Sequence, residues 1–348
     1  MNAASLLPRR YEAQAARLRT TPVAVLLGGR SSEREVSLKS GAAVLRALEG
    51  GPLASLVALE IEPDGRWQRA GRSLRALEVL AELPRETLFF LALHGGEGED
   101  GSVQGLLETQ GFRHTGAGVG ASALCMDKQH TRAVLAAAGL RVARGRLVHP
   151  LEWRTERARV LAELEALAVR GCVVKPNRGG SSVDTFVLED AAGIQARVER
   201  VLQTGDLALV EERLDGVEAT CGVLGNARDE LRALPPVEIV PKPGRFFDYE
   251  EKYSAAGAAE FCPPRSLGEE RTSELRDLAR RAHRAAGCDG YSRTDFFVPA
   301  EGQPVVLEIN TLPGLTDRSL LPLSAAVEGF GFPELCLEIL ALALERGR

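Results

Sequence analysis

The chain has 348 residues, 45% of them hydrophobic and 26% charged, with a net charge of −5; this length suits two or three packed domains of an ordinary globular protein. The negative charge and the lack of a basic stripe argue against a nucleic-acid partner, so local basic groups must hold any anionic substrate. No apolar run is long enough to span a membrane, and six isolated cysteines, none at metal-ligand spacing, predict reduced thiols in a cytoplasmic protein.

The predicted folded part begins with a strand and a glycine turn. Val23–Leu27 is an apolar run typical of a buried strand, and two glycines follow it. Ser32 and Glu35, three residues apart, fit a capping box at the start of a helix. Strand, glycine turn and helix form the unit of a parallel α/β domain, and helix starts of this kind bind anionic or polar groups.

The same order of elements recurs further along the chain. Leu88–Leu93 is a predicted strand, the glycine-rich run 94–101 follows it, and Ser102–Gln110 is helical. Each glycine loop alone is weak, because such loops also serve only to turn a chain. Two of them after strands of one sheet would lie at the same edge, where open α/β folds bind ligands. We therefore predict an N-terminal α/β domain over residues 22–120.

The pattern changes at residue 121, and residues 121–214 are predicted to form an α+β domain. One helix is expected from Ala121 to Ala138, through Met126-Asp127-Lys128. A second, charged and rich in leucine, is expected over Thr155–Val169.

A strand and a flexible loop follow these helices. The strand Cys172–Pro176 carries Lys175, and the loop Asn177–Ser182 contains two glycines and two serines. Backbone amides and hydroxyls of this kind suit a flap over phosphates. The spacing does not match G-x-x-x-x-G-K-[ST], which excludes the common nucleotide loop. Taken alone, Lys175 is more often a surface lysine than a phosphate ligand.

The remaining range, residues 215–348, is predicted to form a third domain. Its expected elements are strands near Ala219–Leu224 and Pro236–Val240, helices over Leu267–Ala286 and Pro333–Arg346, and a hairpin. The loop Gly244–Tyr253 has neither strand nor helix period. Its aromatic and charged residues are therefore either simply exposed or part of a lid.

The hairpin comprises Tyr291–Val298 and Val305–Asn310, joined by a turn-forming run. If it closes symmetrically, Val298 lies opposite Val305. Asp295 then lies opposite Glu308, and Arg293 lies opposite Asn310, all on one face.

Two carboxylates facing each other with an amide beside them call for a positive charge between them. Oxygen ligands without His or Cys favour Mg²⁺, which completes its shell with phosphates and water. The alternative is a solvated hairpin face with ordinary charges.

Six stretches in order carry a resemblance to a known family. They are 27–37 (LGGRSSEREVS), 94–101 (HGGEGEDG), 126–128 (MDK), 174–182 (VKPNRGGSS), 247–253 (FDYEEKY), and 293–295 (RTD) with 308–314 (EINTLPG) and Ser319. From about Thr21 to Arg346 the chain resembles D-alanine–D-alanine ligases of the ATP-grasp superfamily. The resemblance implies an α/β and α+β fold of three domains. An N-terminal parallel α/β domain on the substrate side would precede two α+β domains that clamp ATP.

The resemblance also implies the reaction. ATP would phosphorylate the carboxylate of one D-alanine, and the amine of a second would attack the acyl phosphate to give D-alanyl-D-alanine for peptidoglycan precursors. Phosphoryl transfer needs positioning and charge neutralisation more than a covalent catalyst. A homodimer is what the family leads us to expect.

Site residues follow by motif position. ATP is expected at Lys128 and Lys175 for its phosphates, at Glu211, Leu214 and Glu218 for adenine and ribose, and at Ser182 and Lys252. Two Mg²⁺ ions, for which Mn²⁺ could substitute, are expected at Asp295, Glu308 and Asn310. Glu33 is expected to hold the ammonium of the first D-alanine, and Ser319 the carboxylate of the second. Arg293 and Gly314 are expected to stabilise the developing oxyanion. Ser181 and Tyr253 are expected to close the lid.

The sequence departs from the family pattern at three positions. Glu212 stands where many members place a lysine near the adenine, Gly179 replaces a glutamate, and Asp184 replaces a frequent glycine. These changes bear on ATP affinity and on closure of the phosphate flap. Two alternatives keep the fold: a D-alanine–D-lactate ligase, whose members usually lack the Lys252-Tyr253 pair, and a nucleotide-binding protein without turnover, which would be expected to lack a metal carboxylate or Arg293.

Overall fold

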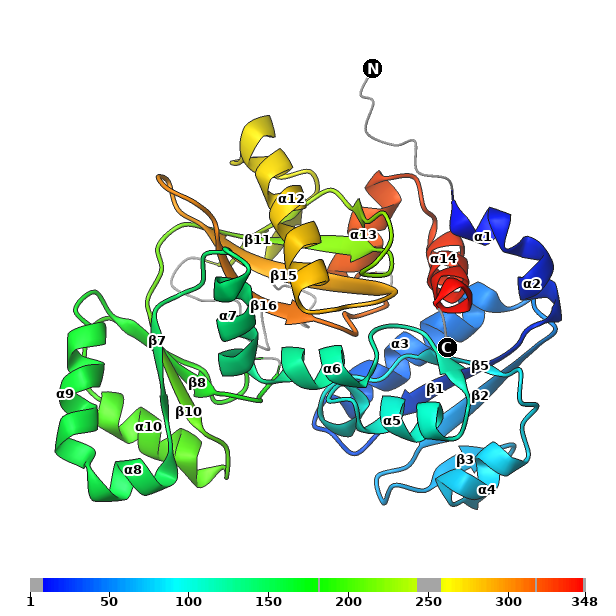
Figure 1. Cartoon of the computed structure of the whole chain (residues 1–348), viewed down its shortest axis with the longest axis horizontal. Helices are drawn as coiled ribbons and strands as arrows, with labels where there is room; N and C mark the ends of the chain where they lie inside the picture. The colour runs from blue at the N-terminus through cyan, green and yellow to red at the C-terminus, as the bar shows by residue number, and fades with distance from the viewer. Residues whose placement is uncertain (1–8, 181, 243–257, 317, 347–348) are drawn as a thin grey trace.

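The protein is described by a computed structural model covering residues 9–180, 182–242, 258–316 and 318–346. It is built around three β-sheets. Figure 1 shows sheet A, from the N-terminal part of the chain, at one end of the molecule and sheet C at the other, with sheet B between them. Within the described ranges, no helix has the length and apolar character needed to cross a bilayer.

Sheet A has the order β4-β3-β2-β1-β5-β6. Its strands are β1 (Pro22–Gly28), β2 (Ser55–Ile61), β3 (Trp67–Arg69), β4 (Arg72–Leu74), β5 (Leu88–Leu91) and β6 (Arg113–His114). The strands β2, β1, β5 and β6 run parallel, while β3 and β4 extend the edge as antiparallel strands. The predicted parallel α/β unit is thus present, and the loops after β1 and β5 leave the same edge of the sheet.

The helices of this part are α3 (Arg34–Leu48), α4 (Ala76–Ala81) and α5 (Ser102–Thr109), with a 3₁₀ turn η1 at Gly96–Gly98. The capping box predicted at Ser32 and Glu35 is wrong: Glu33 is the N-cap residue of α3 and no side chain caps the helix there. The guanidinium of Arg34 anchors the helix start, because it lies 2.5 Å from the Glu60 carboxylate at the end of β2.

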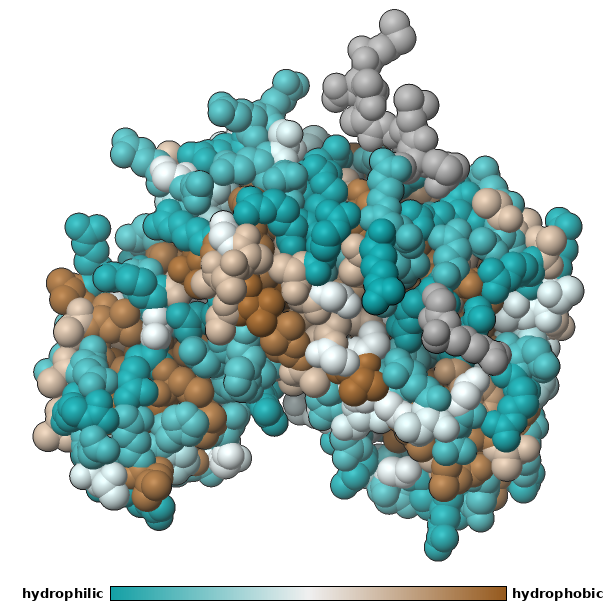
Figure 2. All heavy atoms as spheres, in the orientation of Figure 1, coloured by the Kyte–Doolittle hydropathy of each residue, from teal (hydrophilic) through white to brown (hydrophobic). Residues whose placement is uncertain are grey.

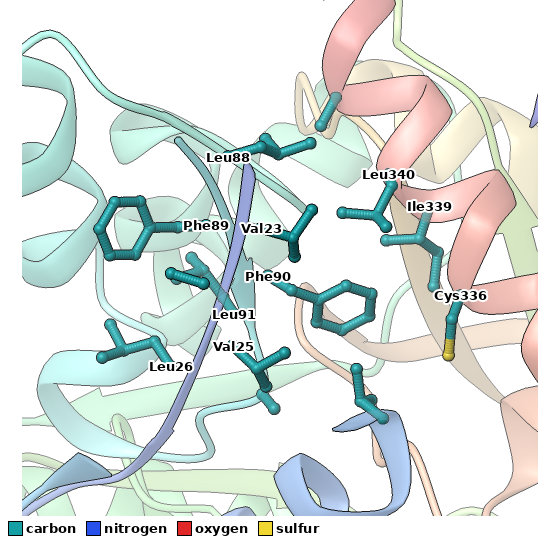
Figure 3. Close-up of a cluster of buried hydrophobic side chains, with 14 of the residues drawn as sticks. Val23, Val25, Leu26, Leu88, Phe89, Phe90, Leu91, Cys336, Ile339 and Leu340 are labelled. Atoms are coloured by element: carbon teal, nitrogen blue, oxygen red, sulfur yellow. The ribbon is translucent and has the colours of Figure 1, made fainter. Parts of the chain in front are cut away.

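The core of sheet A includes a helix from the far end of the chain. Figure 3 shows Val23, Val25 and Phe90 pointing from β1 and β5 toward Ile339 and Leu340 of α14 (Phe332–Glu345). Alternation along a strand sends neighbouring side chains to the opposite face. The N-terminal helices α1 (Arg10–Ala13) and α2 (Ala15–Thr20) also pack on α14.

Sheet C is antiparallel, with the order β7-β10-β8-β9. Its strands are β7 (Gly145–Val148), β8 (Cys172–Pro176), β9 (Phe186–Leu188) and β10 (Ala208–Glu212). One face is covered by α8 (Pro150–Thr155), α9 (Arg157–Leu167) and α10 (Ile194–Gln203), as Figure 1 shows. The helix predicted over Thr155–Val169 is confirmed as α9, which is two residues shorter at each end, and the short helix α8 before it was not predicted.

Sheet B is also antiparallel, with the order β14-β13-β11-β15-β16 and β12 paired to β11. Its strands are β11 (Val217–Leu224), β12 (Arg232–Ala233), β13 (Val237–Val240), β14 (Ala259–Phe261), β15 (Tyr291–Val298) and β16 (Val305–Asn310). The helices α12 (Glu269–Ala285) and α13 (Leu320–Val327) pack against it.

The register of the hairpin β15–β16 was predicted in part. Arg293 lies opposite Asn310 and Asp295 opposite Glu308, as expected. Val298 does not lie opposite Val305, however, because Phe297 does. A bulge at Leu307, the extra residue between these pairs, shifts the register by one, and this shift brings Asp295 opposite Glu308.

The predicted helix from Ala121 to Ala138 is two helices, α6 (Val119–Met126) and α7 (Lys128–Ala137). Asp127 between them has an extended backbone and caps α7 by accepting a hydrogen bond from the His130 amide at 3.0 Å. The break places Lys128 at the first position of α7.

The cores are not contiguous in sequence. Side chains from α6 and α7 pack with those of sheet B, and α14 packs with sheet A, as described above. The three domain ranges 22–120, 121–214 and 215–348 stay a prediction, and packing crosses both of their boundaries.

Candidate active site

Two cavities adjoin where the three sheets meet. The larger, about 1070 Å³, lies against the start of α3, the loop after β5 and the segment before α13. The smaller, about 640 Å³, lies between sheet C and the hairpin β15–β16. Both are lined by Lys128, Gly179, Gly180 and Glu308, which therefore form the junction between them. In Figure 2 the face in view is hollowed between the units built on sheets C and A.

Glu33 lies at the junction of the first cavity with the flap after β8. A Cβ atom built on Gly95 would lie 2.5 Å from Glu33 Oε2, and one built on Gly180 would lie 2.8 Å from it. A side chain at either position would press on the Glu33 carboxylate in the orientation that it has here. Ser31 fixes the loop before α3, because its Oγ accepts a hydrogen bond from the Glu33 amide at 3.2 Å and donates to the His94 carbonyl at 2.6 Å.

Glu99 lies beside this carboxylate in the loop after β5. Its Oε2 accepts a hydrogen bond from the Gly95 amide at 2.8 Å. Burial raises the pKa of Glu99 to about 7, and the negative charges of Glu33 and Glu308 add to that rise. The cavity thus holds closely spaced carboxylates, which favours a bound cation such as an ammonium group.

His94 lies near the start of the loop after β5 as a neutral, buried imidazole. Its Nδ1 lies 3.1 Å from the Leu312 carbonyl, which can only accept, so Nδ1 carries the proton. Nε2 then accepts from the Ser40 hydroxyl at 2.9 Å. Burial, with a smaller contribution from the charge of Arg293, lowers the pKa of His94 to about 4. The imidazole therefore ties α3 to the segment before α13.

Arg293 and Asp295 form a bidentate ion pair on β15. Arg293 Nε and Nη2 donate to the two Asp295 oxygens at 2.9 and 2.8 Å. The same carboxylate accepts from the Thr220 hydroxyl at 2.6 Å and from the Asn310 amide at 3.2 Å. This arrangement gives Asp295 a positive partner supplied by the protein itself.

Lys128 provides the positive charge beside the other hairpin carboxylate. Its Nζ lies 3.9 Å from Glu308 Oε2 and also donates to the Gly179 carbonyl of the flap. Burial lowers the pKa of Lys128 and the charge of Glu308 raises it, with burial the larger effect. Asn177 joins the same helix start to the flap, because its carbonyl and side-chain oxygens accept from the Lys128 and Gln129 amides.

Lys175 and Glu211 lie on neighbouring strands of sheet C and point into the second cavity. Lys175 Nζ is 2.5 Å from Glu211 Oε2. The sequence expectation that Lys175 could be an ordinary surface lysine is wrong, since its side chain is only 14% exposed and its charge is paired. Valine, leucine and phenylalanine side chains supply apolar walls nearby, at Val173, Val187, Leu214, Phe297 and Leu307.

Ser319 and Gly314 lie together at the start of α13. Ser319 is the N-cap residue, and its Oγ accepts from the Thr316 amide at 3.0 Å. A Cβ atom on Gly314 would come within 2.8 Å of that hydroxyl. The positive end of a helix dipole thus faces the first cavity, a geometry that suits an anionic group.

The hairpin offers a divalent metal an incomplete set of ligands. In the part of the chain that the structure describes, no group of three or more His, Cys, Asp or Glu side chains could hold a metal ion. Asp295, Glu308 and the Asn310 amide are nevertheless all oxygen donors at the two cavities. Their chemistry fits Mg²⁺ if phosphate oxygens and water complete its shell.

The predicted site residues divide between the cavities. Those lining the first are Glu33, Arg293, Asn310, Gly314 and Ser319. Those lining the second are Lys175, Ser182, Glu211, Leu214, Glu218 and Asp295, and both are lined by Lys128 and Glu308. Ser181, Lys252 and Tyr253, with the loop that carries the last two, lie outside the described residues.

Two residues escaped the sequence reasoning: Glu99, which lines the first cavity, and Arg132, which pairs with Glu211 of the second. Glu99 falls within the run 94–101, and an acid beside a predicted ligand-binding loop was a usable signal. Arg132 follows Lys128 by four residues on α7, and this spacing places both side chains on one helix face.

The structure also bears on the positions that depart from the family pattern. Asp184 has a φ of 51°, in the left-handed region that glycine adopts freely, and its carboxylate accepts from Arg200 Nε at 3.0 Å. Glu212 is bound by Arg144, whose amide and Nε donate to it at 2.8 Å each. A side chain at position 179 would meet Pro176, because a Cβ there would lie 2.9 Å from the proline Cβ.

Two family descriptions match the chain. Residues 22–86 match the D-ala D-ala ligase N-terminus, and residues 134–341 match the D-ala D-ala ligase C-terminus. A D-alanine–D-alanine ligase of Citrifermentans bemidjiense is 43% identical over 326 residues, which cover 94% of this chain and 97% of the relative. One from Desulforudis audaxviator is 43% identical over 328 residues, covering 93% and 99%.

Solved structures agree with these sequence matches. The VanG D-Ala:D-Ser ligase of Enterococcus faecalis superposes with a TM-score of 0.80 at 28% identity, covering 93% of this chain and 99% of that one. The D-alanine-D-alanine ligase of Coxiella burnetii gives 0.77 at 28% identity, covering 94% and 95%. The fold is thus that of an ATP-grasp ligase, which confirms the predicted fold class. The chain belongs to the D-alanine–D-alanine ligase family.

Proposed function

We propose which residues of this chain perform the reaction of its family, the ATP-dependent ligation of two D-alanine molecules to D-alanyl-D-alanine. As a member of that family the chain is an ATP-dependent ligase acting on small molecules. The observation that carries the residue assignment is the division of the predicted residues between two adjoining cavities that share Lys128 and Glu308. ATP occupies the smaller cavity and the D-alanines the larger, so phosphoryl transfer takes place at the junction.

The first D-alanine is held in the larger cavity by its charges. Its ammonium lies at the carboxylate of Glu33, in a pocket where neighbouring acids already favour a cation. Its carboxylate oxygen attacks the γ-phosphorus of ATP, the bond to the ADP oxygen breaks, and an acyl phosphate forms. Lys128 and Lys175 hold the phosphate charges during this step.

The second D-alanine then binds beside the acyl phosphate. Its carboxylate lies at Ser319 and the positive end of α13. After losing a proton, its amine attacks the acyl carbon. The Gly314 amide and the Arg293 guanidinium stabilise the developing oxyanion, and the tetrahedral adduct expels phosphate to leave the dipeptide.

A divalent metal bound at Asp295, Glu308 and Asn310 would neutralise the phosphates of ATP. We propose two Mg²⁺ ions, with Mn²⁺ as a substitute, because the donors are all oxygens and too few to complete a shell by themselves. For Asp295 to hold the metal, Arg293 would have to give up its ion pair with that carboxylate and turn toward the acyl group. Ser181, Lys252 and Tyr253 keep the roles expected of them in the flap and lid as predictions. A homodimer in the cytoplasm, with no membrane or nucleic-acid partner, completes the proposal.

Phosphate release from ATP tests the function directly. Purified protein is given D-alanine, L-alanine, D-lactate and D-serine, each alone and each with D-alanine. We expect release with D-alanine alone and the dipeptide as product. D-Serine is included because one solved structure of the same fold is a D-Ala:D-Ser ligase. A depsipeptide or D-alanyl-D-serine as the main product would correct the second substrate, and no release with any acid would refute ligation.

A single substitution tests the metal assignment. Glu308→Gln keeps the size of the side chain but removes its charge, so it is expected to lose most turnover while remaining folded. Glu301→Gln is the matched control, because Glu301 lies exposed in the turn of the same hairpin. Near-normal turnover of Glu308→Gln at saturating Mg²⁺ would contradict the assignment.

A further inference from the structure

Glu211 is held between two cations from different elements. Its side chain, on β10, is 6% exposed. Lys175 on β8 lies 2.5 Å from one carboxylate oxygen, and Arg132 Nε on α7 lies 3.0 Å from the other. Arg132 Nε is not aligned to donate a hydrogen bond, so this second contact is an ion pair. Each carboxylate oxygen thus has a cation of its own and keeps lone pairs for a further donor.

Arg132 is itself immobilised. Its residue is 8% exposed, Nη1 donates to Gln129 Oε1 at 2.8 Å, and Nη2 donates to the Ala143 carbonyl at 2.5 Å. A guanidinium fixed at both of its outer nitrogens keeps one orientation. It therefore fixes the position of the carboxylate with which it pairs.

A glycine on the neighbouring strand makes room for this pair. Gly145 on β7 lies opposite Glu211 in the sheet. A Cβ atom there would lie 2.9 Å from Glu211 Cγ and 3.0 Å from Arg132 Nη1. It would also lie 2.9 Å from the backbone carbonyl oxygen of Val210, so any other residue would press on both side chains and on the backbone of β10. The close fit around the ion pair therefore extends across three elements.

We propose that Arg132 is a positioning residue for nucleotide-base specificity, acting through Glu211. This inference rests on the proposed function, which puts ATP in the smaller cavity, and on the place at the adenine that the family resemblance implies for Glu211. A carboxylate held by cations presents acceptors and no donor. The 6-amino group of adenine donates to such an acceptor, whereas the 6-oxo group of guanine or hypoxanthine is itself an acceptor and is repelled.

Lys175 alone does not give the same result. It is also a proposed phosphate ligand, and without Arg132 it would be the only cation on Glu211. The carboxylate would then turn toward the ammonium and away from the base. When Arg132 and Lys175 each pair with one oxygen of Glu211, the carboxylate keeps an acceptor directed at the base. Lys175 then also keeps N–H donors that can bind phosphate.

Equilibrium binding of ADP and inosine diphosphate by calorimetry, with Mg²⁺ present, tests this proposal without requiring turnover. The wild-type protein is expected to prefer ADP. Arg132→Met removes the charge but keeps a side chain of similar length. It should lower the preference for ADP roughly tenfold, mainly by weakening the binding of ADP. Arg132→Lys should restore part of the preference, and the KM for ATP should rise in Arg132→Met while the KM for D-alanine changes little.

Two further variants make the test specific. Arg146→Met removes an arginine of β7 that pairs with Glu152 of α8 and Glu163 of α9 and lines neither cavity, so it controls for stability. Gly145→Ala disturbs the Arg132–Glu211 pair sterically with both charges intact, and serves if Arg132→Met fails to fold. It too should lower the ADP preference.

The outcomes separate this inference from the proposed ligation. Equal binding of both diphosphates by the wild type, or an unchanged preference in Arg132→Met and Gly145→Ala, would overturn the role of Arg132. An equal loss of preference in Arg146→Met would overturn it as well. Failure of phosphate release with D-alanine would refute ligation but leave the base preference measurable.

Discussion

Replacing Glu99 by glutamine tests the electrostatics of the first cavity. The folded protein raises the pKa of Glu99 from 4.5 to about 7, chiefly by burial and then by the charge of Glu33. Glutamine keeps the oxygen that accepts from the Gly95 amide but has no charge to bury. The difference in stability between the two proteins should therefore depend on pH.

The sign follows from which state binds the proton. Between pH 4.5 and about 7 the folded protein keeps the Glu99 proton while the unfolded chain loses it, so the wild type loses stability as pH rises. At 1.36 kcal/mol per pKa unit, the shift corresponds to about 3 kcal/mol above pH 7. Below pH 4.5 the penalty is absent, because both states are protonated.

Urea unfolding of wild type and Glu99→Gln at several pH values between 4.5 and 8 measures the effect. We expect the variant to gain on the wild type as pH rises, by about 2 to 3 kcal/mol at pH 8. Taking the difference cancels other titrating groups. A stability difference that stays constant over this range would show that Glu99 ionises normally and would refute the reasoning.

Three other features are tested by the same unfolding measurement. The pKa of His94 is lowered to about 4, so the wild type becomes less stable as pH falls from 6.5, because the unfolded chain binds the proton first. His94→Asn should lose less stability over that range. Parallel curves of stability against pH for the two proteins would contradict this. Gly41→Ala should destabilise by about 2 kcal/mol, because its Cβ would lie 2.5 Å from that of Leu27, and a neutral result would mean that α3 can shift on β1. Asp184→Ala should be about 1 kcal/mol less stable than Asp184→Gly. Both variants lose the carboxylate, but only glycine adopts a φ of 51° without strain. Equal stabilities would show that residue 184 does not have this left-handed conformation.

Local pattern was sufficient for the strands and glycine loops of the parallel sheet and for the two strands of the hairpin, whereas the facing of Asp295 and Glu308 also needed the bulge at Leu307. Apolar runs, turn residues and alternation along a strand depend on short stretches, and each is legible in the residues themselves. The motif spacing likewise named residues that line both cavities, from Glu33 at one end to Ser319 at the other.

Other features of the fold and the site depend on tertiary packing and cannot be predicted from short stretches of sequence. The docking of α14 on sheet A and the binding of the α7 start by Asn177 depend on partners far along the chain, and the bulge at Leu307 is seen only in the paired strands. The pairing of Arg132 with Glu211 joins residues 79 positions apart, in a space that exists only because Gly145 faces them from a third element. A buried ion that has lost its water must pair with an opposite charge nearby. Which residues are buried, and which charges lie near them, depends on the assembled fold.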